Sequence, residues 1–146
     1  MHGPFPAAAV LARLRSVPAL RLVGGAADLA TARNQQPKTV PAALVVTSEA
    51  ARLPAGASGG QLIQQVEVTL NVVLFVRNVA QQDSGAAARA EMDALVATVR
   101  GALLNWTPAA AFEPIHLRAS RDEAYELGQL VVQELYRTTY RLTVTP

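Results

Sequence analysis

Between residues 66 and 76, an apolar residue stands at every second position, and this alternation constrains the fold more than any other feature. The apolar set is Val66, Val68, Leu70, Val72, Leu74 and Val76. Successive side chains of a strand point to opposite faces, so these six share one face. The other face is polar up to Asn71 and becomes apolar at Val73 and Phe75. We therefore predict a long strand from near Gln61 to Arg77 whose second face is covered, at that end, by a helix or a neighbouring subunit.

A helix is predicted over residues 86–104, after the turn-prone segment 78–85. Its apolar residues recur at helical spacing: Met92, Leu95, Val96, Val99 and Leu103. This stripe is suited to cover the apolar face of the strand. The segment Asn105–Pro108 ends the helix, with Trp106 as a buried lid. We predict one shared core that includes Val68, Leu70, Val72, Leu95, Val99 and Tyr140.

The C-terminal part predicts a short strand over Pro114–Arg118 and a long final strand over Leu130–Val144. In the final strand an inward-facing apolar set alternates with polar residues, and Glu134 interrupts that set. A β-bulge or a strand end near Glu134 is therefore expected. The intervening residues 121–128 (RDEAYELG) have the composition of a turn with a charged surface.

The N-terminal part is less regular. It predicts a short amphipathic helix over Ala7–Leu14, an extended segment over Leu20–Val23 and a single helical turn around Asp28. A strand is expected over Ala42–Thr47. Residues 48–60 (SEAARLPAGASGG) contain few large apolar groups and predict a mobile connector.

The order of these elements predicts an α+β fold, a single domain over residues 1–146 with a mostly antiparallel β-sheet and helices packed on one face. Lys and Arg number 13 against 11 Asp and Glu, and the arginines are dispersed. A nucleic-acid-binding protein normally clusters its positive charge, so we expect no specific nucleic-acid binding. Arg13 and Arg15 interrupt the first apolar stretch well short of a membrane span, which favours a cytoplasmic protein with no membrane partner.

The residues that usually carry chemistry are sparse. The sequence has no cysteine, and its two histidines, His2 and His116, are far apart, so zinc-ligand spacing is absent. The acidic cluster Asp122, Glu123 and Glu126 lacks the pattern of a calcium loop and indicates a solvated turn. No glycine-rich phosphate loop or catalytic triad is recognisable. We expect a protein that is not an enzyme and has no cofactor, no metal site and no catalytic residue.

The order of the segments resembles a known family. The relevant segments are AADLATA followed by PAALVV, then a glycine-rich insertion, QLIQQVEVTLNVVLFVRN, EMDALVATVRGALLNWTP and ELYRTTYRLTVTP. Together they cover nearly the whole chain and are similar to the tail terminator (tail completion) proteins of long-tailed, Mu-like bacteriophages.

This resemblance implies a structural virion protein that forms a ring of six subunits. The ring would cap the last ring of the tail tube, end its polymerisation and present its other side to the head–tail connector. The implied partners are further copies of the chain, the tail tube protein and the connector protein. The implied location is the head–tail junction of the virion, with assembly in the host cytoplasm.

Seven residues are candidates for the contacts of such a ring. They are Glu49, Arg52, Leu53, Val73, Phe75, Arg137 and Arg141. A closed ring needs two different patches on each subunit, and the apolar end of the long strand and the final strand are reasonable candidates. The segment Glu49–Gly60 is expected to order against a neighbouring ring through Arg52 and Leu53. A hairpin insertion without a partner explains that segment equally well.

Two other functional hypotheses remain open on the sequence alone. One is a monomeric module that binds a ligand or peptide on an exposed sheet face. The other is a different head–tail connector or minor tail subunit of similar size. The oligomeric state and the identity of the binding partners distinguish these hypotheses.

Overall fold

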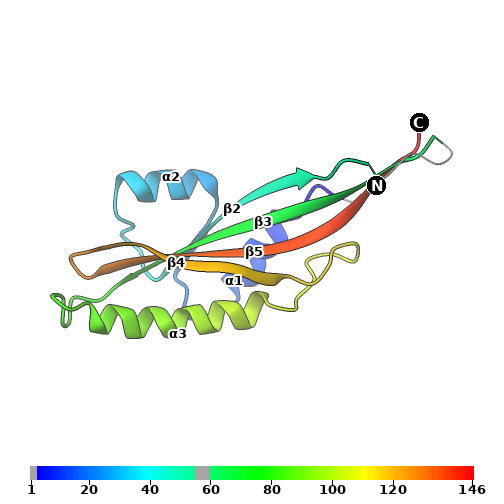
Figure 1. Cartoon of the computed structure of the whole chain (residues 1–146). Coiled ribbons are helices and arrows are strands. Elements are labelled where there is room, and N and C mark those ends of the chain that lie inside the picture. The colour runs from blue at the N-terminus through cyan, green and yellow to red at the C-terminus, as the bar shows by residue number, and fades with distance from the viewer. Residues whose placement is uncertain (1–2, 55–59) are drawn as a thin grey trace.

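A computed structural model describes residues 3–54 and 60–146 and shows a five-stranded sheet flanked by three helices (Figure 1). The elements are α1 (Ala7–Arg15), β1 (Leu22–Gly24), α2 (Ala26–Asn34), β2 (Ala42–Ala51), β3 (Leu62–Arg77), α3 (Ala86–Leu103), β4 (His116–Glu126) and β5 (Gln129–Val144). The strand order is β1-β2-β3-β5-β4. Only β1 and β2 are parallel, and the other neighbours are antiparallel. This architecture confirms the predicted α+β class with a mostly antiparallel sheet.

The main core lies between one face of the sheet and the helices α1 and α3. The six alternating residues of β3 are all buried there, together with the apolar stripe of α3. Val10 and Leu14 of α1 complete this layer. All six residues predicted to share a core belong to it. The apolar face of β3 packs against the apolar stripe of α3 because each element needs a second apolar surface against which to bury its own.

A second, smaller core lies on the opposite face, under α2. It consists of Leu29, Ala42, Leu44, Val73, Phe75 and Val131. The apolar end of β3 is therefore covered by a helix of the same subunit, and helices pack on both faces of the sheet rather than on one. The single helical turn expected around Asp28 is in fact a helix of nine residues. Its start is stabilised because the Gly25 N–H donates to the Asp28 carboxylate at 3.0 Å.

Two segments expected to be irregular are strands. Ser48–Ala51 continues β2 and pairs with β3, so the predicted connector is shorter than residues 48–60. Its residues 55–59 lie outside the described part of the chain. Arg121–Glu126 belongs to β4 rather than to a turn. Because β4 is an edge strand and mostly exposed, it carries charge on both faces and lacks the alternation that marks a half-buried strand.

The expected irregularity at Glu134 was wrong. Glu134 stays in register opposite Val72, and its side chain is fully buried. The register shifts of the sheet occur in β4, between Leu117 and Ala119 and between Asp122 and Ala124. Glu134 keeps its inward position because Arg100 of α3 compensates its charge, as described below.

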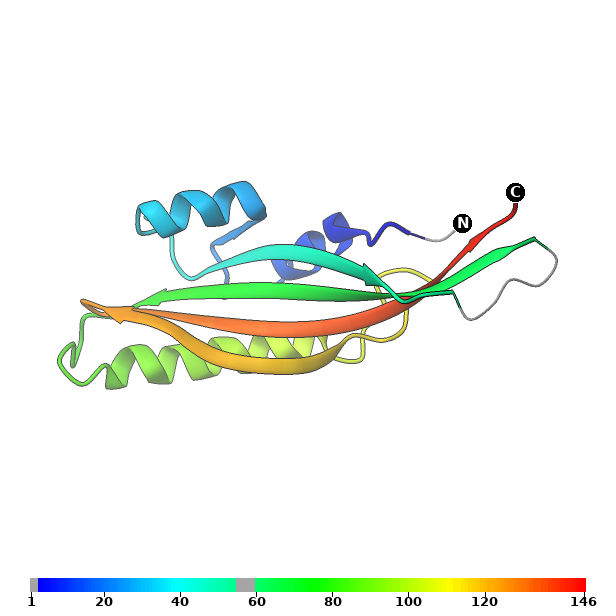
Figure 2. The same ribbon diagram turned by 45° about the horizontal axis from the view of Figure 1, so that its top comes forward.

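The strands β3 and β5 extend past the end of β2 and form a two-stranded arm (Figure 2). The pairing of β2 with β3 ends at Ala51 and Val66, whereas β3 and β5 remain paired as far as Leu62 and Val144. The arm consists of residues 62–65 and 141–144. None of the helices in the described ranges combines the length and apolar character needed to cross a bilayer.

Candidate assembly surface

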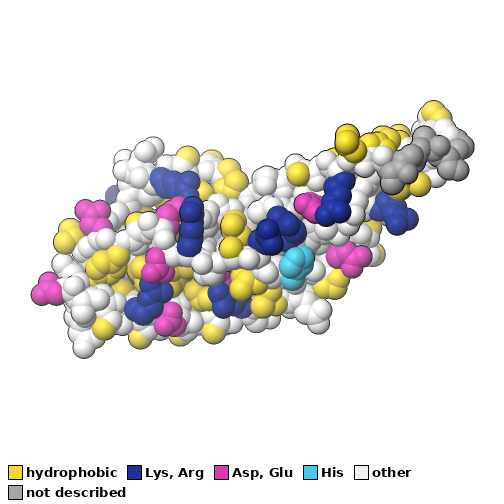
Figure 3. Space-filling view, viewed as in Figure 1, with side chains coloured by type: hydrophobic (Ala, Val, Ile, Leu, Met, Phe, Trp, Pro, Cys, Tyr) yellow, Lys and Arg dark blue, Asp and Glu magenta, His cyan; other side chains and the backbone are white. Residues whose placement is uncertain are grey.

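Helix α2 covers only one end of its sheet face, and the remainder of that face is uncovered. We call this region the open half-face. It carries Ser48, Ala50, Glu67, Thr69, Asn71, His116, Arg137, Thr139 and Arg141. These residues share a face because they lie directly across from one another in neighbouring strands, or two or four positions along the same strand. In the space-filling view from this side, Lys and Arg side chains gather near the histidine that is visible there, coloured cyan (Figure 3).

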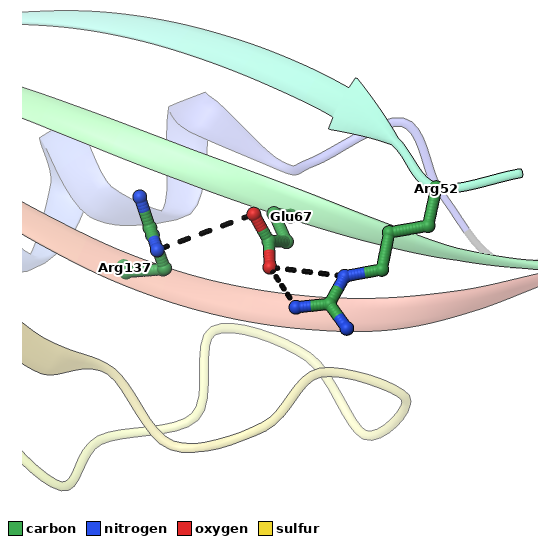
Figure 4. A network of polar contacts seen from close by, with 3 residues as sticks. All are labelled: Arg52, Glu67 and Arg137. Atoms are coloured by element: carbon green, nitrogen blue, oxygen red, sulfur yellow. Dashed lines mark hydrogen bonds and ion pairs between the residues drawn. The ribbon is translucent and has the colours of Figure 1, made fainter.

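At the centre of the open half-face, Glu67 lies between two arginines (Figure 4). Arg52 donates to Glu67 Oε1 from Nη2 at 2.5 Å and from Nε at 3.2 Å. On the other side, Arg137 Nη1 lies 4.0 Å from Glu67 Oε2. The residues come from three segments, since Arg52 follows β2, Glu67 is in β3 and Arg137 is in β5. The network therefore connects the end of β2 to the centre of the sheet.

The arginines also control the ionisation of Glu67. The hydrogen bond from Arg52, followed by its positive charge, lowers the pKa of Glu67 below its ordinary value. The charges of Arg137 and Arg118 lower it further, whereas partial desolvation opposes the shift. Glu67 is consequently ionised throughout the physiological range and holds the two neighbouring guanidinium groups.

Positive charge exceeds negative charge on this surface. Arg52, Arg118 and Arg137 lie around the carboxylate of Glu67, and Arg141 lies on the same face, across from Gln65. Arg118 and Arg141 form no ion pair within residues 3–54 and 60–146. In the same part of the chain, the enclosed atoms Asn71 Oδ1 and Arg137 Nε have no hydrogen-bond partner. Such a surface is complementary to an acidic surface on a partner.

The predicted contact residues divide into three groups. Arg52, Arg137 and Arg141 lie on or beside the open half-face, and the structure brings the first two together on Glu67. Leu53 is 92 % exposed, immediately after β2. Val73 and Phe75 are 0 % and 2 % exposed under α2, so they belong to the interior of the folded subunit and not to its surface.

Glu49 has a different environment from the other predicted contact residues. It lies across from Val68, on the side of the main core. Its carboxylate accepts a hydrogen bond from the Tyr140 hydroxyl at 2.6 Å. Desolvation, reinforced by this hydrogen bond, raises the pKa of Tyr140 to about 12. The Tyr140 ring packs against Phe112, which in turn contacts Phe5 edge-on. Glu49 thus anchors the end of β2 to the aromatic end of the main core.

Sequence reasoning missed the two carboxylates that organise this subunit. Glu67 was treated only as part of the polar face of β3, although both of its arginine partners were candidates. Glu134 is fully buried and accepts from Arg100 Nε at 2.7 Å, Arg100 Nη2 at 2.9 Å and the Tyr136 hydroxyl at 3.1 Å. Desolvation, and then the charge of Glu134, raises the pKa of Tyr136. An acidic residue inside an apolar alternation is itself a signal for a buried basic partner.

The remaining polar clusters are accounted for by internal pairing. Asp122 pairs with Arg89 at 2.5 Å and Glu123 pairs with Arg33 at 2.6 Å. Across the described residues, no group of three or more His, Cys, Asp or Glu side chains is placed to hold a metal ion. Two hollows, of about 500 and 540 Å³, lie beside the start of α3 and beside Phe112. The first is lined by Ser84 and Tyr125 and by the two carboxylates that pair with Arg89 and Arg33.

The whole chain matches a model of a known protein family. One family model matches residues 1–146, the full length of the chain, and its description is phage tail terminator protein. The search of curated proteins gave no match.

Proposed function

The chain belongs to the phage tail terminator family, a family of structural tail proteins, and from this premise we propose that its subunits form a ring that caps the tail tube. The ring ends the polymerisation of the tube and joins the tail to the head–tail connector. The family match over the entire chain is the observation that carries this proposal. The proposed ring has six subunits, is assembled in the host cytoplasm and stays in the virion.

The chemistry of the surface supports a role in assembly. The charged open half-face suits a protein partner because two of its arginines, Arg52 and Arg137, are held by Glu67. Contacts that join rigid, preorganised charges lose little conformational entropy on binding. A closed ring requires two different patches on each subunit, and the open half-face supplies one of them.

Exposed apolar side chains lie at both ends of the subunit, which supports a separate docking surface at each end. Leu53, Leu62 and Ile63 lie at the arm end of the subunit, at 92 %, 38 % and 37 % exposure. Val79, Tyr125 and Leu127 lie at the opposite end, near the turn between β4 and β5. The strands run between these ends (Figure 2). A cap that contacts the tube on one side and the connector on the other needs two such ends.

The proposal is tested by polymerising purified tail tube protein with and without this protein. We expect tubes grown in its presence to stop lengthening and to carry a ring at one end in negative-stain images. The variant Arg137→Glu/Arg141→Glu places two negative charges on the open half-face and is expected to abolish the effect. The control is Arg15→Glu/Arg21→Glu, which changes the same net charge outside that face.

Two results would contradict the proposed function. The first is unchanged tube growth with no protein bound at the tube end. The second is a protein that remains monomeric both alone and in the presence of tubes. A ring that binds only the connector would instead favour a connector subunit.

A further inference from the structure

The two edges of the sheet differ in how well they are protected against pairing with a strand of another molecule. This difference indicates how subunits join. We propose that the free edge of β2 pairs with the first half of β4 in a neighbouring copy, so that one sheet continues into the next. This inference rests on the proposed ring and specifies the contact that closes it.

The free edge of β2 is the segment Val46–Ala51. On its outer side, β1 pairs with Ala42, Ala43 and Leu44, and the parallel pairing of Gly24 with Leu44 also engages the Val45 N–H. Beyond Val45, the outer side of β2 has no strand partner among the described residues. Backbone groups that point outward from such an edge are available for pairing with another strand.

The direction of these backbone groups follows from two hydrogen bonds. The Arg52 N–H donates to the Gln65 carbonyl of β3 at 2.9 Å, whereas the Pro41 carbonyl accepts from Arg21 on the β1 side at 2.9 Å. Backbone groups alternate in direction along a strand. The odd-numbered residues between these points therefore direct N–H and C=O outward, at Val45, Thr47, Glu49 and Ala51.

This edge lacks the usual protection against pairing. Residues 46–51 (VTSEAA) contain no proline and no lysine, and their pairing with β3 continues without a register shift. The one charged group, Glu49, is engaged by the Tyr140 hydroxyl. Exposed edges normally carry charges, prolines or bulges that prevent association. An unprotected edge of six residues is typical of strand addition.

The opposite edge is protected more strongly in its second half than in its first. Four charged residues fall in the second half of β4: Arg121, Asp122, Glu123 and Glu126. Through the strand register, Arg121 and Asp122 are level with Leu44 and Ala43, where β1 already covers β2. The first half of β4, His116–Ser120, has Arg118 as its only side chain of full charge and one register shift, between Leu117 and Ala119.

The two free segments lie at the same height in the subunit. Ala119 is level with Val46, and His116 is level with Ser48, through β5 and β3. β4 and β2 also run in opposite directions, because three antiparallel pairings separate them. A second copy, rotated about an axis along the strands, therefore offers an antiparallel partner to the free edge. Such a head-to-tail contact is the kind that closes a ring.

Disulfide cross-linking tests this contact directly, because the chain has no cysteine. Ala119→Cys is combined in turn with Val46→Cys, Ser48→Cys and Ala50→Cys, since closed sheets stagger their strands and the register between copies is not fixed. Within one subunit, β3 and β5 separate these positions by about 14 Å, three strand spacings. A disulfide spans Cα atoms no more than about 7 Å apart, so the cross-link forms only between copies.

We expect at least one pair to give a ladder of covalent oligomers that ends at the size of the ring. The matched control combines each β2 cysteine with Val79→Cys, a residue that is 63 % exposed and lies beside the turn between β4 and β5, outside the first half of β4. It is expected to give only the low cross-linking of random collisions. Equal cross-linking by the Ala119 and Val79 sets would overturn the proposal.

Proline substitution provides a second test that uses the direction of the N–H groups. Ala51→Pro and Thr47→Pro each remove an outward donor, which is tolerated on an edge strand. We expect each to weaken association about tenfold while the melting temperature stays near that of the parent. Ser48→Pro removes a donor that points to β3, so its main effect is expected on the melting temperature.

The outcomes separate this inference from the proposed function. Rings that form and cap tubes, but show no edge cross-link and tolerate both prolines, overturn the edge contact and leave the function in place. Absence of both rings and tube binding refutes the proposed function itself. Cross-linking of the β2 cysteines to tube protein, with none to Ala119→Cys, would assign the edge to a different partner and also overturn the inference.

Discussion

At the scale of single residues, the most constrained position is Glu134, a fully buried carboxylate in the middle of β5. Its two oxygens accept from Arg100 at 2.7 and 2.9 Å, and one of them also accepts from Tyr136. A buried charge is tolerated only when it is paired and hydrogen-bonded. The same pair links α3 to the sheet beside the apolar stripe, and so contributes to the position of the helix along the strands.

Removal of the Arg100 side chain is therefore expected to destabilise the subunit strongly. Arg100→Ala leaves Glu134 buried without its cation, which costs about 3 kcal/mol or more in the free energy of unfolding. Arg89→Ala, on the same helix, breaks an exposed pair and is expected to cost less than about 1 kcal/mol. Urea denaturation measures both values. Similar losses for the two variants would show that the buried pair has no special role.

Ionisation of Tyr140 is expected to lower the stability of the subunit at alkaline pH. Its folded-state pKa, about 12, is higher than the ordinary value of 10.0. Because the folded state favours the protonated phenol, this contribution to stability is complete below pH 10 and is lost as the pH rises toward 12. We expect Tyr140→Phe to reduce the loss of stability between pH 9 and pH 11. Denaturant midpoints at the two pH values, for both proteins, measure the difference. Parallel changes in the two proteins would exclude this assignment.

At the scale of elements, β3 and α3 were predictable because each buries one regular face. Their periods of two and about 3.6 residues are visible in the sequence, and they lead directly to the main core. Helix α2 was underestimated because only Leu29 of its nine residues is buried, which leaves almost no periodic signal. The start of β4 was predicted as a strand, whereas its second half was mistaken for a turn because an exposed edge strand has no apolar alternation.

The candidate contact residues were also only partly predictable from local sequence patterns. Arg137 and Arg141 could be proposed from their position on the polar face of the final strand, and Arg52 from the connector that contains it. Their shared partner, Glu67, could not be proposed, because the register that brings Arg52 and Arg137 to it is set by three separate segments. The pairing of Arg100 and Glu134 likewise joins residues 34 positions apart. The local sequence pattern identifies which residues share one face of an element. The register between elements determines which side chains come into contact.

The packing of α3 against β3 is expected to account for much of the stability of the subunit. Leu70→Ala and Leu95→Ala each remove a large side chain from the main core, where the two residues are 0 % and 4 % exposed. Each is expected to cost about 2–5 kcal/mol. The control Leu53→Ala, at a position that is 92 % exposed, is expected to have little effect. If all three variants melted alike, the proposed core would be wrong.

At the scale of the whole molecule, the segment that joins β2 to β3 follows the free edge in the sequence. Its predicted role is to order against a neighbouring ring through Arg52 and Leu53. Replacement of residues 53–60 by a tight turn is expected to leave folding intact, since their sequence contains few large apolar side chains, and to prevent docking on tubes. Circular dichroism and tube pull-down measure the two effects separately. Normal yields of infectious particles with the shortened segment would rule out the role.

The long antiparallel pairing of β3 and β5 has a mechanical consequence. Each strand has 16 residues, and the two are in register from Leu62 opposite Val144 to Arg77 opposite Gln129. Their hydrogen bonds are perpendicular to the strands. A force applied at Leu62 and Gln129 pulls the strands past each other and loads all these bonds at once. A force applied at Arg77 and Gln129 opens them one after another. Tension along the strands follows the first geometry, so optical-tweezer pulling from the first pair of handles should require the larger rupture force.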